Sequence, residues 1–222
     1  MNTGDRVGCE DDNTLPIAGV VFAGGRSRRM GRIKALMPYG ESTFLETVVE
    51  KMSRAGITPI IVVLTYHANE IIERTRLPRD MFVINHSRNF VRTGLEEIVK
   101  RAAHPSAILI CPVDIPAIRV RSLRALAKSS VKRGASVMVP MQGRKLVATL
   151  AVISRQFLPW SLRLSLLFFR SNLLSSALLF FFVATLIILR QCRLKVLKTN
   201  DPGMLANINT PLDYLRLDQT KA

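Results

Sequence analysis

The chain has 222 residues and a formal net charge of +16, and this length suits one α/β domain with a single core. The three cysteines, Cys9, Cys111 and Cys192, are widely spaced and form no C-x-x-C pair, which excludes a disulfide framework and a cysteine-based zinc site. The charge is uneven, because residues 115–200 hold fifteen Lys or Arg and no Asp or Glu. This stretch is a compositional break rather than direct proof of a basic binding surface.

Residues 1–15 are mostly polar and include several acids, and they lack the basic start and apolar stretch of a signal peptide. We expect them to form a disordered tail on a reduced, cytoplasmic protein. The histidines His67, His86 and His104 show no metal-ligand spacing, so we expect them to be ordinary surface or loop residues.

From residue 17 onward, apolar β-branched runs alternate with amphipathic segments of helix length. The expected strands are Ile17–Ala23, Pro59–Thr65, Met81–Asn85, Ala107–Val113 and Ser136–Pro140. The expected helices are Thr43–Arg54, Ala68–Arg76, Gly94–Ala103 and Val120–Arg133. Near-continuous apolar strands separated by helices predict an α/β fold: a three-layer, Rossmann-like domain with a mostly parallel sheet. Such sheets bind ligands at the carboxyl ends of their strands.

The loop after the first expected strand is rich in glycine and arginine. Residues 22–34 read FAGGRSRRMGRIK, and the adjacent glycines let backbone N–H groups approach phosphate oxygens because no Cβ is in the way. Arg28 and Arg29 supply planar guanidinium forks, and Lys34 supplies a point charge. The spacing fits neither the dinucleotide-binding nor the Walker motif. We interpret the loop as a phosphate-binding loop, with a solvated basic surface loop as the alternative.

Residues 18–40, AGVVFAGGRSRRMGRIKALMPYG, resemble the L-A-x-G-x-S-x-R-M-G-x-x-K-x-L-x-P loop of the molybdenum-cofactor nucleotidylyltransferase-like (MobA/MocA-like NTP transferase) family. The resemblance implies an NTP-transferase domain over residues 16–218, of the nucleotide-diphospho-sugar transferase type. The implied nucleotide-binding residues in this loop are Ala23, Gly24, Gly25 and Ser27. The implied catalytic residues, which would contact the triphosphate, are Arg29 and Lys34.

A second segment, CPVDIP at residues 111–116, resembles the family's strand-end aspartate and places Asp114 in the metal position. A carboxylate at the end of a central strand is the hard oxygen ligand that Mg²⁺ prefers. The metal would neutralise the α-phosphate and the pyrophosphate leaving group during attack on an NTP. As an alternative, an aspartate followed by Ile-Pro can cap a turn.

Residues 201–217 resemble the family's ending D-P-G-x-L-x-D-I-D-T-P-E-D-Y, but Asn207 and Asn209 replace its two aspartates. An amide oxygen at Asn207 would make a weaker second Mg²⁺ ligand. Residues 92–100 resemble a Gly-Met-x-Ser-Ser segment near the base and ribose, which implies that Gly94 binds nucleotide. Glutamates at positions 96 and 97 replace the usual hydroxyl residues there.

Residues 145–193 are atypical. The family's Gly-His-Pro is missing, and the resemblance stops after Pro159 until about Val196. Residues 171–189 form a 19-residue uncharged run, which is long enough to span a bilayer. Three interpretations stay open: a membrane helix, a buried core or dimer helix, and a local shift of the reading frame that would impair the enzyme. Under the frame-shift interpretation we expect a helix over residues 160–190 that packs poorly on the sheet.

We expect a Mg²⁺-dependent nucleotidyltransferase that transfers an NMP from CTP or GTP to a small phosphorylated acceptor such as molybdopterin cofactor and releases pyrophosphate. The alternative is a basic RNA- or membrane-binding protein without catalysis, suggested by a pI near 10.9. The aromatic residues of the basic stretch cluster together instead of alternating with the cations. We therefore expect neither a nucleic-acid nor a membrane partner.

Overall fold

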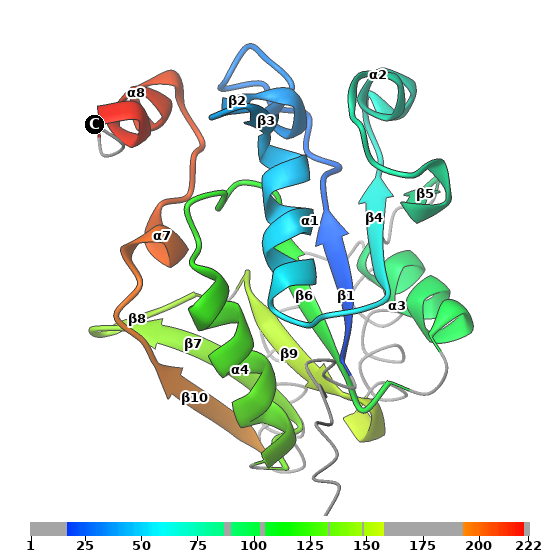
Figure 1. Ribbon diagram of the computed structural model, residues 1–222, viewed down its shortest axis with the longest axis vertical. Coiled ribbons are helices and arrows are strands. Elements are labelled where there is room, and N and C mark those ends of the chain that lie inside the picture. The colour runs from blue at the N-terminus through cyan, green and yellow to red at the C-terminus, as the bar shows by residue number, and fades with distance from the viewer. Residues whose placement is uncertain are drawn as a thin grey trace, which may run out of the picture.

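A computed structural model describes residues 17–86, 90–102, 105–132, 134–147, 149–157 and 193–219. Its main sheet comprises β1 (Ile17–Phe22), β4 (Ile60–Leu64), β5 (Phe82–Ile84), β6 (Ala107–Pro112), β7 (Val137–Gln142), β8 (Lys145–Leu146), β9 (Ala151–Ser154) and β10 (Leu194–Lys198). The strand order is β10-β7-β9-β6-β1-β4-β5, and β8 pairs with β7 (Figure 1). The α/β prediction with a mostly parallel sheet is confirmed.

Helices cover both faces of this sheet. The α-helices are α1 (Phe44–Arg54), α2 (Ala68–Arg74), α3 (Phe90–Arg101), α4 (Val120–Lys132), α7 (Pro202–Leu205) and α8 (Pro211–Gln219). Figure 1 shows α1 and α4 in front of the sheet. The short elements are the 3₁₀ turns η1 (Lys34–Leu36), η2 (Arg79–Met81) and η3 (Arg155–Phe157), and the hairpin of β2 (Pro38–Tyr39) with β3 (Ser42–Thr43).

The central strand β1 is buried on both sides and pairs in parallel with β4 and β6. Ile17 and Val21 belong to the core formed with α1 and α4. Ala18 and Val20 belong to a second core formed with α3. Because successive strand residues point to opposite faces, an apolar run such as IAGVVF can supply both cores.

The helix α1 is specified by its own sequence. Thr43 Oγ1 accepts a hydrogen bond from the Glu46 backbone N–H at 3.2 Å, and the Glu46 carboxylate accepts one from the Thr43 N–H at 2.8 Å. This capping box satisfies backbone donors that the first helical turn leaves unpaired. Phe44, Val48 and Met52 form the buried stripe, as the periodicity predicted.

Residues beyond Pro140 also join the sheet. The strand β9 pairs antiparallel with both β6 and β7, and β10 pairs in parallel with β7. The sequence predicted none of β8, β9 and β10. Its atypical range, residues 145–193, includes β8 and β9, and β10 begins just after that range. Within that range, residues 145–147 and 149–157 lie in or beside the sheet.

Several expectations concern residues outside the described ranges: the tail at residues 1–15, His104, and the helix expected over residues 160–190. His67 and His86 are described and exposed. Among the helices of the described ranges, none is long and apolar enough to cross a membrane.

Candidate active site

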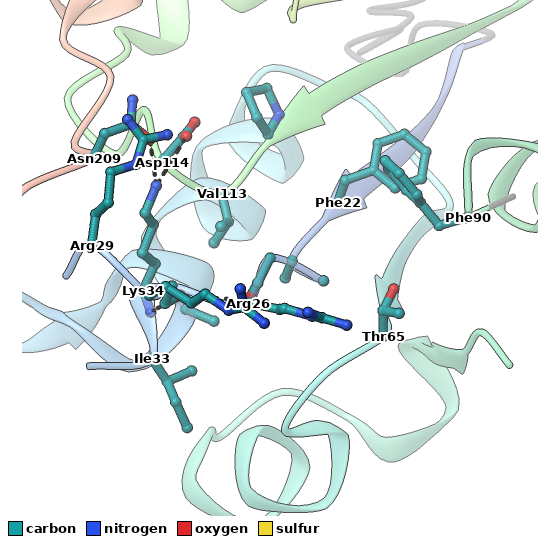
Figure 2. Close-up of a pocket in the computed structure, with 17 residues that line it drawn as sticks. Phe22, Arg26, Arg29, Ile33, Lys34, Thr65, Phe90, Val113, Asp114 and Asn209 are labelled. Atoms are coloured by element: carbon teal, nitrogen blue, oxygen red, sulfur yellow. Dashed lines mark hydrogen bonds and ion pairs between the residues drawn. The ribbon is translucent and has the colours of Figure 1, made fainter. Parts of the chain in front are cut away.

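A cavity of about 500 Å³ opens at the carboxyl ends of β1 and β6. The loop after β1 forms much of its wall, and Figure 2 shows side chains from several distant parts of the chain around it. Those other parts are Thr65 after β4, Phe90 at the start of α3, residues 112–114 at the end of β6 and just beyond it, and Asn209. This is the edge at which parallel α/β sheets bind ligands.

The glycine loop keeps its backbone close to β4. Ala23 N–H donates to the Val63 carbonyl at 3.0 Å, and a Cβ at Gly24 would clash with the Thr65 side chain. At Gly25 a Cβ would meet no atom within 4 Å, so this position faces open space at the cavity wall. The absence of side chains at both glycines leaves backbone and space available to a ligand.

The far side of the loop is closed by Ser27. Its hydroxyl accepts a hydrogen bond from the Lys34 backbone N–H at 3.1 Å, and its carbonyl accepts one from Met30 N–H at 3.0 Å. Ser27 and Gly31 both have positive φ, at 49° and 65°, which lets the chain turn back within a few residues. These contacts fix where the Lys34 side chain starts.

Lys34 connects two oxygen-bearing side chains in the cavity. Its Nζ donates to Asn209 Oδ1 at 2.5 Å and lies 3.7 Å from Asp114 Oδ2. Figure 2 shows these contacts as dashed lines. Burial raises the pKa of the Asp114 carboxyl, and the nearby Lys34 ammonium opposes that rise.

The turn that carries Asp114 is tied to three other elements. Val113 N–H donates to the Phe22 carbonyl at 3.2 Å, and the Asp114 carbonyl accepts from Ile208 N–H at 3.0 Å. Lys51 Nζ, from α1, donates to the Pro116 carbonyl at 2.6 Å. The end of β1, the C-terminal segment and α1 therefore position this carboxylate together.

The C-terminal segment is anchored by a buried carboxylate. Asp201 is 1% exposed, and it accepts hydrogen bonds from the backbone N–H groups of Arg119 at 2.9 Å and Gly203 at 3.0 Å. Further along, Asp213 Oδ2 accepts from Asn209 N–H at 3.0 Å. The backbone of Asn209 is thereby held where its side chain reaches Lys34.

The other end of the cavity is apolar. The rings of Phe22 and Phe90 meet edge to face, with centroids 5.1 Å apart and an angle of 84° between planes. Thr65 also lies on this side, away from Lys34 and Asp114 in Figure 2. One cavity thus offers cations, a carboxylate and an amide at one end, and aromatic surface at the other.

Most residues expected at the site line this cavity: Ala23, Gly24, Gly25, Ser27, Arg29, Lys34 and Asp114. Gly94 does not line it, because it lies within α3, where a Cβ would sit 3.0 Å from the Val20 and Val63 methyl groups. Asn207 is exposed and also does not line it, whereas Asn209 does. The sequence analysis assigned no role to Phe22, Thr65, Phe90 or Asn209.

Comparisons with known proteins show which family this chain resembles. A family model for the MobA-like NTP transferase domain matches residues 19–175, and so extends beyond Pro159. A probable molybdenum cofactor guanylyltransferase from Mycobacterium tuberculosis (strain ATCC 25618 / H37Rv) is 31% identical over 138 residues, which cover 60% of this chain and 65% of that protein. The match thus spans just under two thirds of this relative's length.

Another relative is nicotine blue oxidoreductase from Paenarthrobacter nicotinovorans, 32% identical over 121 residues that cover 53% of this chain and 59% of that protein. Among solved structures, a nucleotidyl transferase from Methanothermobacter thermautotroptrophicus superposes with a TM-score of 0.67 and 25% identity, covering 92% of this chain and 96% of that one. The matched residues 19–175 include the glycine loop, Lys34 and Asp114 and make up most of the chain, so the protein belongs to the MobA-like NTP transferase domain family.

Proposed function

We propose that this protein is a nucleotidyltransferase that transfers an NMP from CTP or GTP to a small phosphorylated acceptor, with molybdopterin cofactor as the favoured acceptor. One observation carries the proposal: a glycine loop, Lys34 and Asp114 meet in the same cavity as an aromatic pair. A nucleoside triphosphate has matching parts, a flat base and a polyanionic tail. The family and the guanylyltransferase relative support this chemistry.

The reaction has a simple balance. An oxygen of the acceptor phosphate bonds to the α-phosphorus, the bond from that phosphorus to the bridging oxygen breaks, and pyrophosphate leaves with the electron pair. In our proposal Gly24 and Gly25 present the loop backbone to the phosphates, and Arg29 and Lys34 stabilise the negative charge that builds on the leaving group. Ser27 fixes the loop backbone from which the Lys34 side chain extends.

The residues present fit a divalent cation. Asp114 Oδ2 and Asn209 Oδ1 both lie near one positive charge, the Lys34 ammonium, and carboxylate and amide oxygens are ligands of Mg²⁺. No group of three or more His, Cys, Asp or Glu side chains suited to a metal occurs within the described ranges. Mg²⁺ would therefore be held by Asp114 and Asn209 together with phosphate oxygens and water, and would neutralise charge on the phosphates.

Release of pyrophosphate tests the proposal directly. Each of CTP, GTP, ATP and UTP is incubated with Mg²⁺, with and without molybdopterin cofactor, and we expect acceptor-dependent release from CTP or GTP. Lys34→Ala and Asp114→Ala should each lower kcat/KM by roughly 10²-fold or more. Lys128→Ala on the exposed face of α4 is the matched control and should retain wild-type activity. Undiminished release by both site variants would contradict the assigned roles.

A further inference from the structure

We propose that the Lys34 ammonium holds the cation position between Asp114 and Asn209 in the nucleotide-free protein, and that a divalent cation takes this position only when a triphosphate draws Lys34 away. The inference builds on the proposed function, and it adds an order of binding: nucleotide and metal enter together, and the free protein excludes the metal.

The contacts of Lys34 support this assignment. Its Nζ makes its short contact with the neutral amide oxygen of Asn209 at 2.5 Å, and it lies farther, at 3.7 Å, from the Asp114 carboxylate. Both oxygens belong to the class that divalent cations bind. An ammonium and a metal ion cannot occupy one position, so the metal must displace the lysine or stay out.

The charges in the cavity oppose a metal that enters alone. Four cations line the cavity, Arg26, Arg28, Arg29 and Lys34, and among the described residues that line it Asp114 is the one carboxylate. A divalent ion added beside Lys34 would bring further positive charge to a site that already carries an excess. A triphosphate makes the charge in the cavity favourable for a metal, because it supplies anionic oxygens both for the metal and for the displaced ammonium.

The backbone lets Lys34 move without unfolding the loop. Its N–H is bound to Ser27 Oγ at 3.1 Å, and this backbone contact does not depend on where the ammonium lies. A lysine side chain is a flexible four-carbon stem with a compact charge. The stem can therefore turn from Asn209 toward the glycine loop, which lines the same cavity.

Binding of Mn²⁺ to the protein without nucleotide tests this inference and needs no turnover. Free Mn²⁺ is followed by electron paramagnetic resonance in the wild type and in Lys34→Met, which keeps the chain length and removes the charge. We expect Lys34→Met to bind Mn²⁺ at least tenfold more tightly than the wild type. Lys34→Gln serves as a second variant if Lys34→Met unfolds, as judged by circular dichroism.

The matched control separates position from net charge. Arg28→Gln removes one positive charge from the same loop, but among the described residues Arg28 makes no hydrogen bond or ion pair with Asp114 or Asn209. Its Mn²⁺ affinity should change much less than that of Lys34→Met. Equal tightening in the two variants, or no tightening in Lys34→Met, overturns the inference.

Nucleotide should strengthen Mn²⁺ binding more in the wild type than in Lys34→Met. A non-hydrolysable α,β-methylene NTP should raise the Mn²⁺ affinity of the wild type by a larger factor than that of Lys34→Met, because the wild type also relocates its lysine. An equal rise in both proteins overturns the inference. If the wild type releases pyrophosphate but Lys34→Met does not bind Mn²⁺ more tightly, the proposed function stands and this inference fails. If Lys34→Met binds Mn²⁺ more tightly but the wild type releases no pyrophosphate, the inference about the cation position stands and the proposed function fails.

Discussion

Asp114 carries its charge where burial favours the neutral acid. Desolvation raises the pKa of its carboxyl, and the Lys34 ammonium offsets this only in part. At neutral pH the folded protein therefore bears the cost of an ionised, half-buried group. A carboxylate that is costly to bury and sits at the carboxyl end of a central strand is typical of a functional position.

The first prediction is that Asp114→Asn stabilises the protein at neutral pH while it lowers nucleotidyl transfer. Because the folded-state pKa is raised, the native state binds a proton more readily than the unfolded state, and wild-type stability falls as pH rises through that interval. An asparagine at position 114 carries no charge, so it does not incur the cost of burying one. At pH 7 we expect a gain of about 1 kcal/mol in unfolding free energy, measured by urea denaturation.

This gain should shrink as the pH approaches about 4, where an ordinary Asp is itself becoming protonated. Repeating the urea titration at that pH is the control, since any benefit from better packing of the amide would persist there. A lower midpoint for Asp114→Asn at pH 7 would show that the contact with Lys34 outweighs the burial of the charge.

Substitutions at two neighbouring glycines distinguish the effect of core packing from the effect of ligand access. A Cβ at Gly24 clashes with Thr65, whereas at Gly25 it meets no atom within 4 Å. We expect Gly24→Ala to cost about 1–3 kcal/mol of stability through overpacking, and Gly25→Ala to stay within about 0.5 kcal/mol of the wild type. Both variants should bind NTP more weakly than the wild type, as measured by calorimetry. Full binding by Gly25→Ala would place the phosphates away from this residue.

At the scale of elements, the C-terminal segment braces the turn that carries Asp114. Asp201 holds the Arg119 and Gly203 N–H groups, and Ile208 N–H donates to the Asp114 carbonyl. A Cβ at Gly203 would run into the Ala117 carbonyl, so the two backbones are in direct contact. The position of Asn209 therefore depends on residues that do not line the cavity.

Asp201→Ala tests this brace. It leaves two backbone N–H donors without an acceptor in a buried place, and we expect a loss of about 2–4 kcal/mol in unfolding free energy. Asp201→Asn keeps one acceptor oxygen and should lose less. Activity of the folded fraction should fall in both variants because Asn209 shifts. Wild-type stability in Asp201→Ala would mean that the segment is held by its apolar contacts instead.

The start of α3 shows why part of the site was missed from the sequence. The pattern predicted a helix over Gly94–Ala103, but the structure begins α3 at Phe90. Gly94 is inside the helix, where its missing side chain lets α3 approach Val20 and Val63. Tertiary packing overrides propensity here, and the earlier start brings Phe90 to the cavity.

For the whole molecule, the elements before Pro140 were predictable because each buried strand and amphipathic helix has its own periodic signal. The short β9 was not predictable, because it lies antiparallel between β6 and β7. The local sequence pattern does not indicate which strands pair with each other. The sequence also did not indicate whether Asn207 or Asn209 lines the cavity. Which of them does so depends on the turn that exposes Asn207, in which its N–H donates to the Leu205 carbonyl at 2.8 Å.

The net charge of +16 yields the last prediction. Most ion pairs of the described residues join neighbours three or four apart on one helix, such as Arg74 with Glu70 and Arg92 with Glu96, and each contributes only about 0.3–0.5 kcal/mol. Self-repulsion of a strongly cationic chain outweighs them. Raising NaCl from about 20 to about 300 mM, which shortens the Debye length, should therefore raise the urea midpoint.

Pyrophosphate at matched ionic strength should raise that midpoint further, because it binds the cavity as well as screening charge. A hundredfold excess over its Kd would add about 2.7 kcal/mol. This extra stabilisation should be smaller in Lys34→Met but unchanged in Lys128→Met, which removes the same charge from the exposed face of α4. If chloride and pyrophosphate raised the urea midpoint equally, the stabilisation would be general screening and the cavity would have no preference for a polyphosphate. If NaCl lowered the midpoint, the local ion pairs would contribute more than the charge repulsion.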